Sequence, residues 1–313
     1  MAEGSPTVGS PIPLTLVAGF LGAGKTTLLT RMIERRAAAS GPRPRLAVVV
    51  NEFAGVGLDA VRLPEGDYDK WELSRGSIFC FCLRSDFITL LERIVCEVKP
   101  DEIWVEATGI ADVAEVHKML SVPSLRTALH LRTVVCVVDP RTILKVLVTL
   151  RAARTQVESA GLILLNKTDT ADEQALTAIE RELRAINSAA PIMRCVQGHV
   201  NLACLPHAPL RQDEGATMGH PPQQVMSVSI AEAWIIPRAA FDAWCVSQGE
   251  RIWRAKGRVR TPAGFFWLEA VMGATTWTPS AAALPLPADT TLAFVGPDLN
   301  AEEIRSSIAA LLK

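Results

Sequence analysis

A glycine-rich segment near the start of the chain has residue types suited to binding phosphate. It reads Gly-Phe-Leu-Gly-Ala-Gly-Lys-Thr-Thr over residues 19–27 and fits the pattern GxxxxGK[ST] at every defined position. Its glycines allow backbone conformations closed to other residues, so successive N–H groups can turn towards an anion. Lys25 would place a cation on the outer phosphates, and the Thr26 hydroxyl is placed to bind Mg²⁺. The residues predicted to contact the bound phosphates are Gly19, Gly22, Ala23, Gly24, Lys25, Thr26 and Thr27.

A second motif, Asn166-Lys167-Thr168-Asp169, indicates which base those phosphates carry. The Asn166 amide can read the Hoogsteen edge of a purine. The Asp169 carboxylate can accept two N–H donors of guanine, whereas adenine offers no matching pair and would leave a buried carboxylate unpaired. Lys167 belongs to the same motif, and Gln197 lies in a later loop that can reach the base or the ribose. The motif therefore favours GTP over ATP and predicts a guanine nucleotide as ligand.

Two acidic residues follow apolar runs of strand length. Glu106 closes the run 102–105, and Gly109 just beyond it offers an accessible N–H to a γ-phosphate. Glu52 follows the run 46–50 and would approach Mg²⁺ or its waters in a switch-like loop; the alternative is that Glu52 only solvates a turn. The predicted catalytic residues are Lys25, Glu52 and Glu106, and the predicted magnesium ligands are Thr26, Glu52 and Glu106.

The elements that must position these residues alternate between strands and helices. Apolar runs predict strands at residues 14–18, 46–50, 102–105, 133–138, 161–165 and 191–196, and helical periodicity predicts helices at 85–98, 140–150 and 172–187. Such alternation is typical of right-handed βαβ units. The predicted fold class is therefore α/β, with a P-loop NTPase-type, mostly parallel sheet, helices on both faces, and a smaller C-terminal α+β domain.

Changes in composition suggest four parts of the chain. Residues 1–12 form a flexible tail, residues 13–200 a P-loop GTPase domain, residues 201–224 a linker rich in proline, histidine and glycine, and residues 225–313 a C-terminal domain. Within that last part, strands are expected at 225–230, 252–259, 265–271 and 291–296, and helices at 237–247 and 301–312. The sequence does not fix the oligomeric state and leaves a homodimer open.

The overall composition excludes several classes of protein. The 313 residues include 32 Lys and Arg against 33 Asp and Glu, so no basic field favours nucleic acid or an anionic membrane. No apolar run approaches the ~20 residues that a membrane span needs. The start of the chain lacks the features of a secretory signal, and seven scattered cysteines, an odd number, predict reduced thiols in the cytoplasm.

Taken together, the motifs resemble the CobW-like GTPases, relatives of the nickel-enzyme maturation GTPases within the P-loop class. The resemblance covers nearly the whole chain from about Pro13. It depends on GFLGAGKTT at 19–27, NEF at 51–53, ELS with a following glycine at 72–76, ExxG at 106–109, NKTD at 166–169 and RAKG at 254–257. It implies a Mg²⁺-dependent GTPase whose CobW C-terminal-like domain contacts client proteins, and a metal-insertion role that delivers zinc or cobalt or activates a metalloenzyme.

The chain departs from the family at the loop that follows ELSxG. In the family that loop carries CxCC, whose thiolates bind the cargo metal, but here it retains Cys80 and Cys82 as a CxC pair. Two thiolates could hold Zn²⁺ or Co²⁺ if another ligand helped, since tetrahedral zinc usually has four ligands. Alternatively, both cysteines are ordinary semi-buried residues. Cys204, His207 and His220 are further candidate ligands, although their irregular spacing favours a solvated linker.

These observations predict a cytoplasmic, slow GTP hydrolase that acts as a switch for maturation of a metal- or cofactor-dependent client. Turnover without a partner is expected to be slow, because no arginine finger or glutamine can be assigned from the sequence. The competing hypothesis is a GTP-dependent client activator that carries no metal and docks through Trp253, Phe265, Phe266 and Trp267. A small-molecule kinase is disfavoured because it would leave the guanine motif without a purpose.

Overall fold

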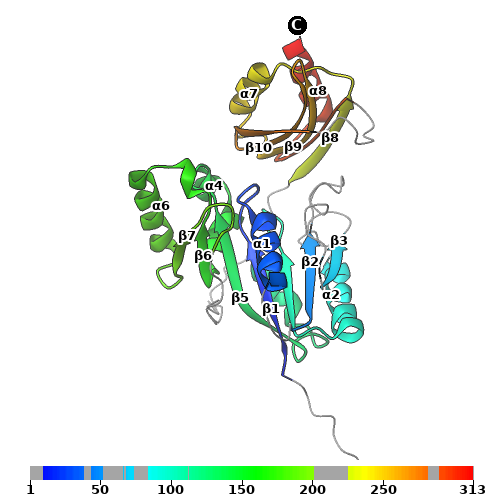
Figure 1. Cartoon of the computed structure of the whole chain (residues 1–313), viewed down its shortest axis with the longest axis vertical. Coiled ribbons are helices and arrows are strands. Elements are labelled where there is room, and N and C mark those ends of the chain that lie inside the picture. The colour runs from blue at the N-terminus through cyan, green and yellow to red at the C-terminus, as the bar shows by residue number, and fades with distance from the viewer. Residues whose placement is uncertain are drawn as a thin grey trace, which may run out of the picture.

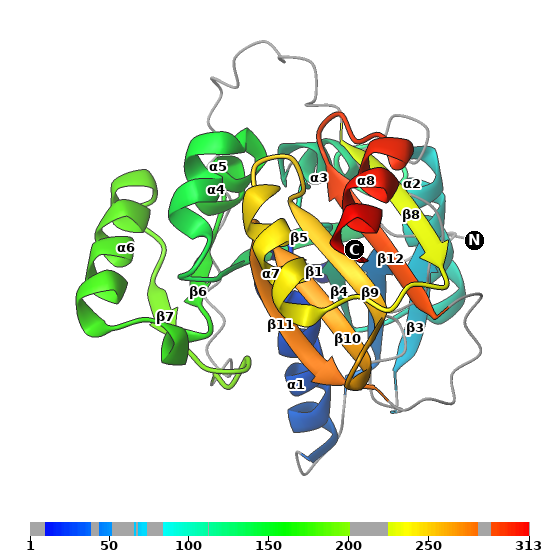
Figure 2. The same cartoon turned by 90° about the horizontal axis from the view of Figure 1, so that it is seen from above.

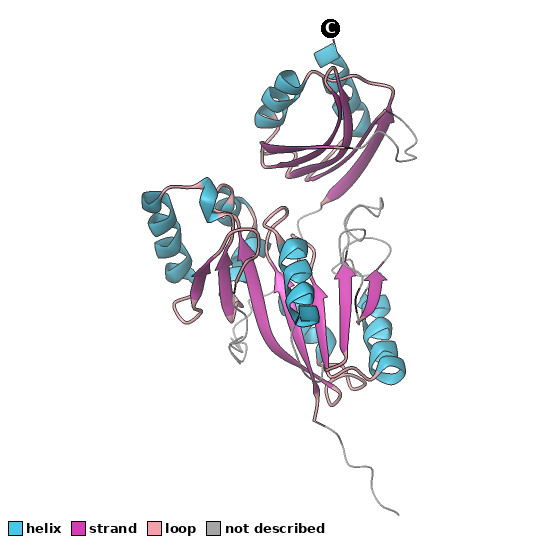
Figure 3. Ribbon diagram, in the orientation of Figure 1, coloured by secondary structure: helices cyan, strands magenta, loops and turns pink. Residues whose placement is uncertain are grey.

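The computed structural model describes residues 10–38, 44–51, 66, 68–73, 84–111, 113–200, 225–280 and 289–312. Within these ranges the chain forms two sheets, each with its own helices (Figures 1 and 3). The first is a parallel seven-stranded sheet, and the second is an antiparallel five-stranded sheet. The predicted fold class, an α/β domain with a smaller α+β domain, is confirmed. No helix in the described ranges is both long enough and apolar enough to cross a bilayer.

The first sheet has the strand order β3-β2-β4-β1-β5-β6-β7. Its strands are β1 (Ile12–Ala18), β2 (Leu46–Asn51), β3 (Asp69–Leu73), β4 (Glu102–Glu106), β5 (Leu129–Val138), β6 (Leu162–Leu165) and β7 (Ile192–Arg194). The helices between them are α1 (Lys25–Ala38), α2 (Arg84–Arg93), the π-helix η3 (Ile94–Val98), α3 (Val113–Leu120), α4 (Ile143–Thr149), α5 (Arg151–Glu158), the 3-10 turn η4 (Thr168–Thr170) and α6 (Glu173–Ile186).

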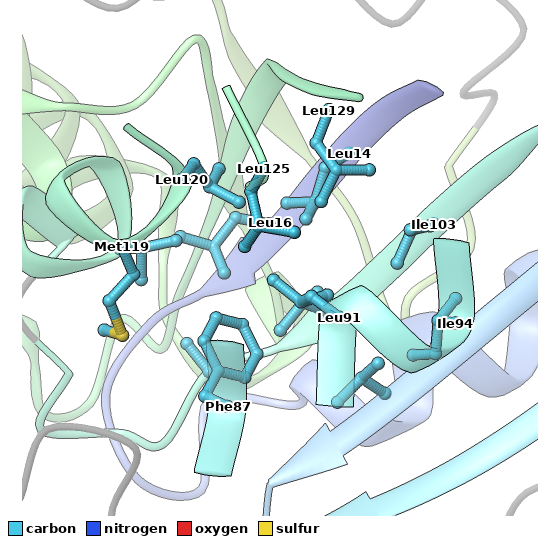
Figure 4. Packing of buried hydrophobic residues seen from close by; sticks show 14 of the residues in the cluster. Leu14, Leu16, Phe87, Leu91, Ile94, Ile103, Met119, Leu120, Leu125 and Leu129 are labelled. Atoms are coloured by element: carbon cyan, nitrogen blue, oxygen red, sulfur yellow. The ribbon is translucent and has the colours of Figure 1, made fainter. Parts of the chain in front are cut away.

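Both faces of this sheet are covered, as its continuous apolar strands require. On one face, Leu14 and Leu16 of β1 pack against Phe87 and Leu91 of α2 and against residues of α3 (Figure 4). On the opposite face, Val17 packs against the apolar side of α1. Burial on both faces fixes β1 in the middle of the sheet, so the segment that follows it emerges at the centre of the sheet's carboxyl edge.

The carboxyl edge gathers the ends of several strands around that segment. β1 lies between β4 and β5; the chain passes from β1 to β2 in one direction along the sheet and from β4 to β5 in the other. Such a reversal of strand order is where open α/β sheets bind ligands. It places Glu106 on one side of β1, with Asp139 and Asn166 on the other.

The second sheet has the order β11-β10-β9-β12-β8. Its strands are β8 (Met226–Glu232), β9 (Arg254–Thr261), β10 (Gly264–Val271), β11 (Ala274–Pro279) and β12 (Thr290–Gly296), and its helices are α7 (Arg238–Ser247), α8 (Ala301–Ala309) and the 3-10 turn η5 (Ala310–Leu312). α7 and α8 cover one face through Phe241, Trp244 and Ile304. The other face turns towards the carboxyl edge of the first sheet, and Figure 2 shows its strands projecting over that edge.

The structure corrects two expectations and adds elements that the sequence did not predict. The predicted helix 140–150 spans only Ile143–Thr149, because Asp139 accepts hydrogen bonds from the Arg141 backbone and side chain and so holds a turn before it. α3, α5, β3 and β11 were not predicted as elements. Trp253, expected on an exposed docking face, is buried between the two sheets.

Candidate functional site

The glycine-rich segment forms a tight loop between β1 and α1. Gly19 has a φ of +133°, and a Cβ added there would lie 2.1 Å from the Val137 carbonyl oxygen. Only glycine fits this combination of left-handed conformation and close approach. The loop ends where α1 begins at Lys25, so the positive end of the α1 dipole faces the space that the loop encloses.

Lys25 is buried at the base of this loop. Its Nζ donates to the carbonyl oxygens of Gly19, at 2.9 Å, and of Phe20, at 3.1 Å. Burial lowers the pKa of Lys25 to about 8, although the nearby Glu106 raises it. A cation held here by carbonyl dipoles is stabilised further when an anion enters the loop, as a phosphate ligand requires.

Thr26 and Glu106 meet although 80 positions separate them in sequence. The Thr26 hydroxyl donates to Oε1 of Glu106 at 2.8 Å. Glu106 is 6% exposed, and within the described part of the chain its Oε2 has no hydrogen-bond partner. Burial raises the pKa of this carboxyl, while Lys25 and the Thr26 hydrogen bond lower it.

A buried carboxylate oxygen beside a hydroxyl oxygen is a suitable donor set for Mg²⁺, which prefers hard oxygen ligands. The residues present therefore fit the predicted magnesium site on the Thr26 and Glu106 side. Glu52, the third predicted ligand, lies outside the described residues, as do Cys80, Cys82, Cys204, His207 and His220. Among the residues that are described, no group of three or more His, Cys, Asp or Glu is placed to hold a metal.

Gly109 lies directly against the glycine-rich segment at residues 19–27, here called the phosphate loop, on the side where Gly109 was predicted to contact a γ-phosphate. A Cβ added at Gly109 would lie 2.5 Å from the Leu21 backbone nitrogen. The buried amide of Gln156 on α5 holds the turn by donating to the Ala111 carbonyl at 2.9 Å and to that of Gly109 at 3.5 Å. Sequence reasoning missed Gln156, because nothing in the α5 pattern separates this glutamine from a solvated one.

Asn166 connects the phosphate loop to the loop at residues 197–199. It is 1% exposed, and its Nδ2 donates to the Ala23 carbonyl at 2.9 Å. Its Oδ1 accepts from the Gly198 N–H at 3.1 Å and from the Cys195 thiol at 3.4 Å. The amide thus joins three segments, and its predicted contact with the base stays a prediction.

The other residues of the base motif surround this amide. Lys167 has a left-handed backbone, and its Nζ donates to the Gly22 carbonyl at 2.6 Å and pairs with Asp139 at 3.0 Å. Burial raises the pKa of Asp139, but hydrogen bonds from Arg141 and the charge of Lys167 outweigh it, so the pKa is lowered overall. Sequence reasoning named Lys167 but missed Asp139, which anchors it.

Asp169 and Gln197 are both exposed and therefore accessible to a ligand. Gln197 precedes Gly198, which packs so closely on the start of α1 that an added Cβ would lie 3.0 Å from the Leu28 Cα. Ala23 is buried and Thr27 is exposed at the first turn of α1. The arrangement can hold phosphates at the phosphate loop, with a base directed towards Asn166, Asp169 and the loop at 197–199.

The family model described as "CobW/HypB/UreG, nucleotide-binding domain" matches residues 13–194, and the model described as "Cobalamin synthesis protein cobW C-terminal domain" matches residues 225–312.

Two curated relatives and one solved structure illustrate the similarity. Zinc chaperone YeiR of Escherichia coli is 29% identical over 53% of this chain and 49% of that protein. Zinc-regulated GTPase metalloprotein activator 1 of Schizosaccharomyces pombe is 30% identical over 61% of this chain and 47% of that protein. The chain therefore spans about half the length of these relatives. The crystal structure of Zn(II)-bound YjiA GTPase from E. coli aligns over 97% of this chain and 100% of that chain, with a TM-score of 0.48 and 23% identity.

Proposed function

The chain belongs to the CobW/HypB/UreG nucleotide-binding family, and from that premise we propose that it is a Mg²⁺-dependent, slow GTPase that acts as a metallochaperone or metal-insertion switch for a client protein. The observation that carries the nucleotide part of this proposal is the contact between Thr26 and Glu106 beside Lys25. This contact brings together the Thr26 hydroxyl, the Glu106 carboxylate and the Lys25 ammonium at the start of α1. One oxygen of that carboxylate has no hydrogen-bond partner among the described residues. GTP, Mg²⁺ and a client metalloprotein or cofactor-dependent enzyme are the proposed ligands and partner.

The proposed chemistry is hydrolysis of the bond between the β- and γ-phosphates. Lys25 would offset charge that develops on the transferred phosphoryl group, and Gly109 would couple that group to the position of its own turn. Thr26 and Glu106, with Glu52, would hold Mg²⁺, which supplies positive charge next to the outer phosphate oxygens. The side chains position and polarise, and none needs to act as a nucleophile.

Guanine selectivity provides the first test. We expect calorimetry in Mg²⁺ to detect GTP and GDP binding and no ATP binding, because only guanine donates two N–H groups to Asp169. Asp169→Asn should weaken GTP binding about thirtyfold and strengthen binding of xanthosine triphosphate, whose ring offers an acceptor to the new amide.

Asp172→Asn is a matched control for that variant. Asp172 is exposed three positions further on and caps α6 by accepting from the Ala175 N–H at 2.8 Å, a role that asparagine also performs. The GTP affinity of the Asp172→Asn variant should equal that of the native protein. Absence of heat with both GTP and GDP for well-folded native protein would refute the guanine-nucleotide proposal.

A metal-carrying role draws its support from the family and from relatives described as zinc chaperones. If Cys80 and Cys82 hold a transferred ion, Cys80→Ser with Cys82→Ser should reduce bound zinc to background while GTP hydrolysis continues. Cys96→Ser is the matched control, since Cys96 is an exposed free cysteine on η3. Metal content would be measured by mass spectrometry after purification with and without GTP.

The second candidate is a GTP-dependent activator that carries no metal, consistent with the name of the S. pombe relative. Background metal content in the native protein, together with unchanged client activation in the double cysteine variant, would favour it. A division into residues 13–200, a linker at 201–224 and residues 225–313 is proposed with either candidate.

A further inference from the structure

The second sheet contacts the phosphate loop itself. Phe20 and Leu21 of the loop belong to one buried apolar cluster with residues of the C-terminal part of the chain, namely Trp253, Val271, Met272 and Val295. A Cβ added at Gly22 would lie 2.5 Å from Cγ2 of Val271. Side chains of β10 and of its neighbouring strands at this point therefore lie at the edge of the phosphate site.

β9 carries a row of cations on the face that contacts the loop. Arg254, Lys256, Arg258 and Arg260 alternate along it. The residues between them include Ala255 and Val259, which belong to the core under α7 and α8. Because successive side chains of a strand point to opposite faces, the four cations share the face away from that core.

Arg254 is the member of this row nearest the phosphate loop. In the strand register it lies opposite Val271 of β10 and Val295 of β12, two residues of the cluster that covers Phe20 and Leu21. Arg260 lies at the far end of the row, six positions further on, or about 20 Å along an extended strand.

The guanidinium of Arg254 pairs with a carboxylate that lies beside Gly22. Its Nη2 pairs with Oε1 of Glu269 at 3.1 Å, and the side chain is 18% exposed. The same Glu269 oxygen would lie 3.7 Å from a Cβ added at Gly22. The ion pair thus lies next to the loop backbone that encloses the phosphate position.

Arg254 is also coupled electrostatically to the two buried groups of the phosphate site. Burial lowers the pKa of Lys25, Glu106 raises it, and the charge of Arg254 lowers it further. Burial raises the pKa of Glu106, and Arg254 is among the charges that lower it. Lys25 and Arg254 thus bring two positive charges to the loop, beside the carboxylates of Glu106 and Glu269, and both cations would attract a phosphate that enters it.

We propose that Arg254 is a phosphate ligand supplied in cis by the C-terminal sheet, donating to the γ-phosphate of a nucleotide bound in the loop. The proposal depends on the GTPase function proposed above. During hydrolysis water attacks the γ-phosphorus, the bond to the β–γ bridging oxygen breaks, and GDP and inorganic phosphate leave. Arg254 forms no covalent bond and transfers no proton; its planar, permanently charged fork offsets negative charge on the transferred group.

The test compares Arg254→Ala and Arg254→Lys with the native full-length protein. We expect Arg254→Ala to lower both single-turnover GTP hydrolysis and affinity for a non-hydrolysable GTP analogue about tenfold, with GDP affinity unchanged, because GDP lacks the γ-phosphate. Arg254→Lys keeps the charge and the fold of the sheet but loses the fork, so its values should fall between those of alanine and arginine. Thermal unfolding would show that each variant is folded.

Arg260→Ala is the matched control from the far end of the same row. Arg260 pairs with Asp289 at 2.6 Å and is 42% exposed, so its loss removes an equal charge without touching the loop. Its hydrolysis and its affinities should equal the native values. Equal losses of GDP and analogue affinity in folded Arg254→Ala or Arg254→Lys, or native kinetics in both, would overturn the role of Arg254. Failure of the native protein to bind GTP would instead overturn the proposed function on which that role depends.

Discussion

Glutamine in place of Glu106 should lower the rate of GTP hydrolysis about a thousandfold, by analogy with loss of a charge-stabilising group from an active site. The amide oxygen can still accept the Thr26 hydrogen bond, which now spans 2.8 Å, so the local geometry is kept. What disappears is the negative charge that favours Mg²⁺ at this position. Single-turnover hydrolysis in saturating GTP and Mg²⁺ measures the loss.

Stability should move in the opposite direction in this variant. Burial raises the pKa of Glu106, which means that the folded state disfavours its ionised form relative to the unfolded chain. A neutral glutamine avoids that cost, so the free energy of unfolding at neutral pH should be equal to or greater than that of the native protein. If misfolding caused the fall in activity, the free energy of unfolding of the variant would instead be lower than that of the native protein.

Glu102→Gln provides the matched control. Glu102 begins the same strand, β4, at the opposite edge of the sheet, where it pairs with Arg36. The identical change there should leave hydrolysis unaffected and lower stability by about 1 kcal/mol, as for a partly buried ion pair. Hydrolysis by Glu106→Gln within a few-fold of the native rate would contradict the role given to this carboxylate.

Alanine at Asn166 should lower both stability and nucleotide affinity. The side chain makes buried hydrogen bonds to Ala23, Gly198 and Cys195, and their loss should cost about 3 kcal/mol of unfolding free energy. The same bonds fix the phosphate loop relative to the loop at 197–199, so GTP affinity should fall about a hundredfold as preorganisation is lost. Chemical denaturation and calorimetry give the two quantities.

Asn187→Ala separates these effects. Asn187 is also buried, and its amide donates to the Val157 and Ala160 carbonyls, at 2.9 Å each, away from the phosphate loop. The variant should show a similar loss of stability, with the GTP affinity of its folded fraction unchanged. If Asn166→Ala lost stability alone, the amide would be structural and the base-reading hypothesis would be weakened.

Features encoded by neighbouring residues could be predicted from the sequence. The phosphate loop is local: β1, the glycines and the first turn of α1 follow one another, and each has a distinctive composition. Glu106 was also predictable, because an acid that ends an apolar strand must lie at the sheet's carboxyl edge. Its pairing with Thr26 follows once β1 and β4 are adjacent.

Features that depend on how elements pack could not be predicted in the same way. Asp139 reaches Lys167 because β5 and β6 pair in a particular register, and no spacing in the sequence encodes that register. The short α4 results from a side-chain hydrogen bond of Asp139, which competes with the helical pattern of residues 140–150. Arg254 belongs to the RAKG motif at residues 254–257, which the sequence shows. Its position near Gly22 depends on the packing of one sheet against the other.

The apolar side chains of Phe20 and Leu21 have a thermodynamic consequence. They are shielded from water by Trp253 and Val271, so the loop proposed to bind the triphosphate shares a buried apolar contact with the C-terminal sheet. If a partner protein pulled the C-terminal sheet away and so changed the affinity for nucleotide, the nucleotide would change the affinity for that partner by the same factor. Reciprocal control of this kind would need no separate relay, because the two binding events would meet at this hydrophobic contact.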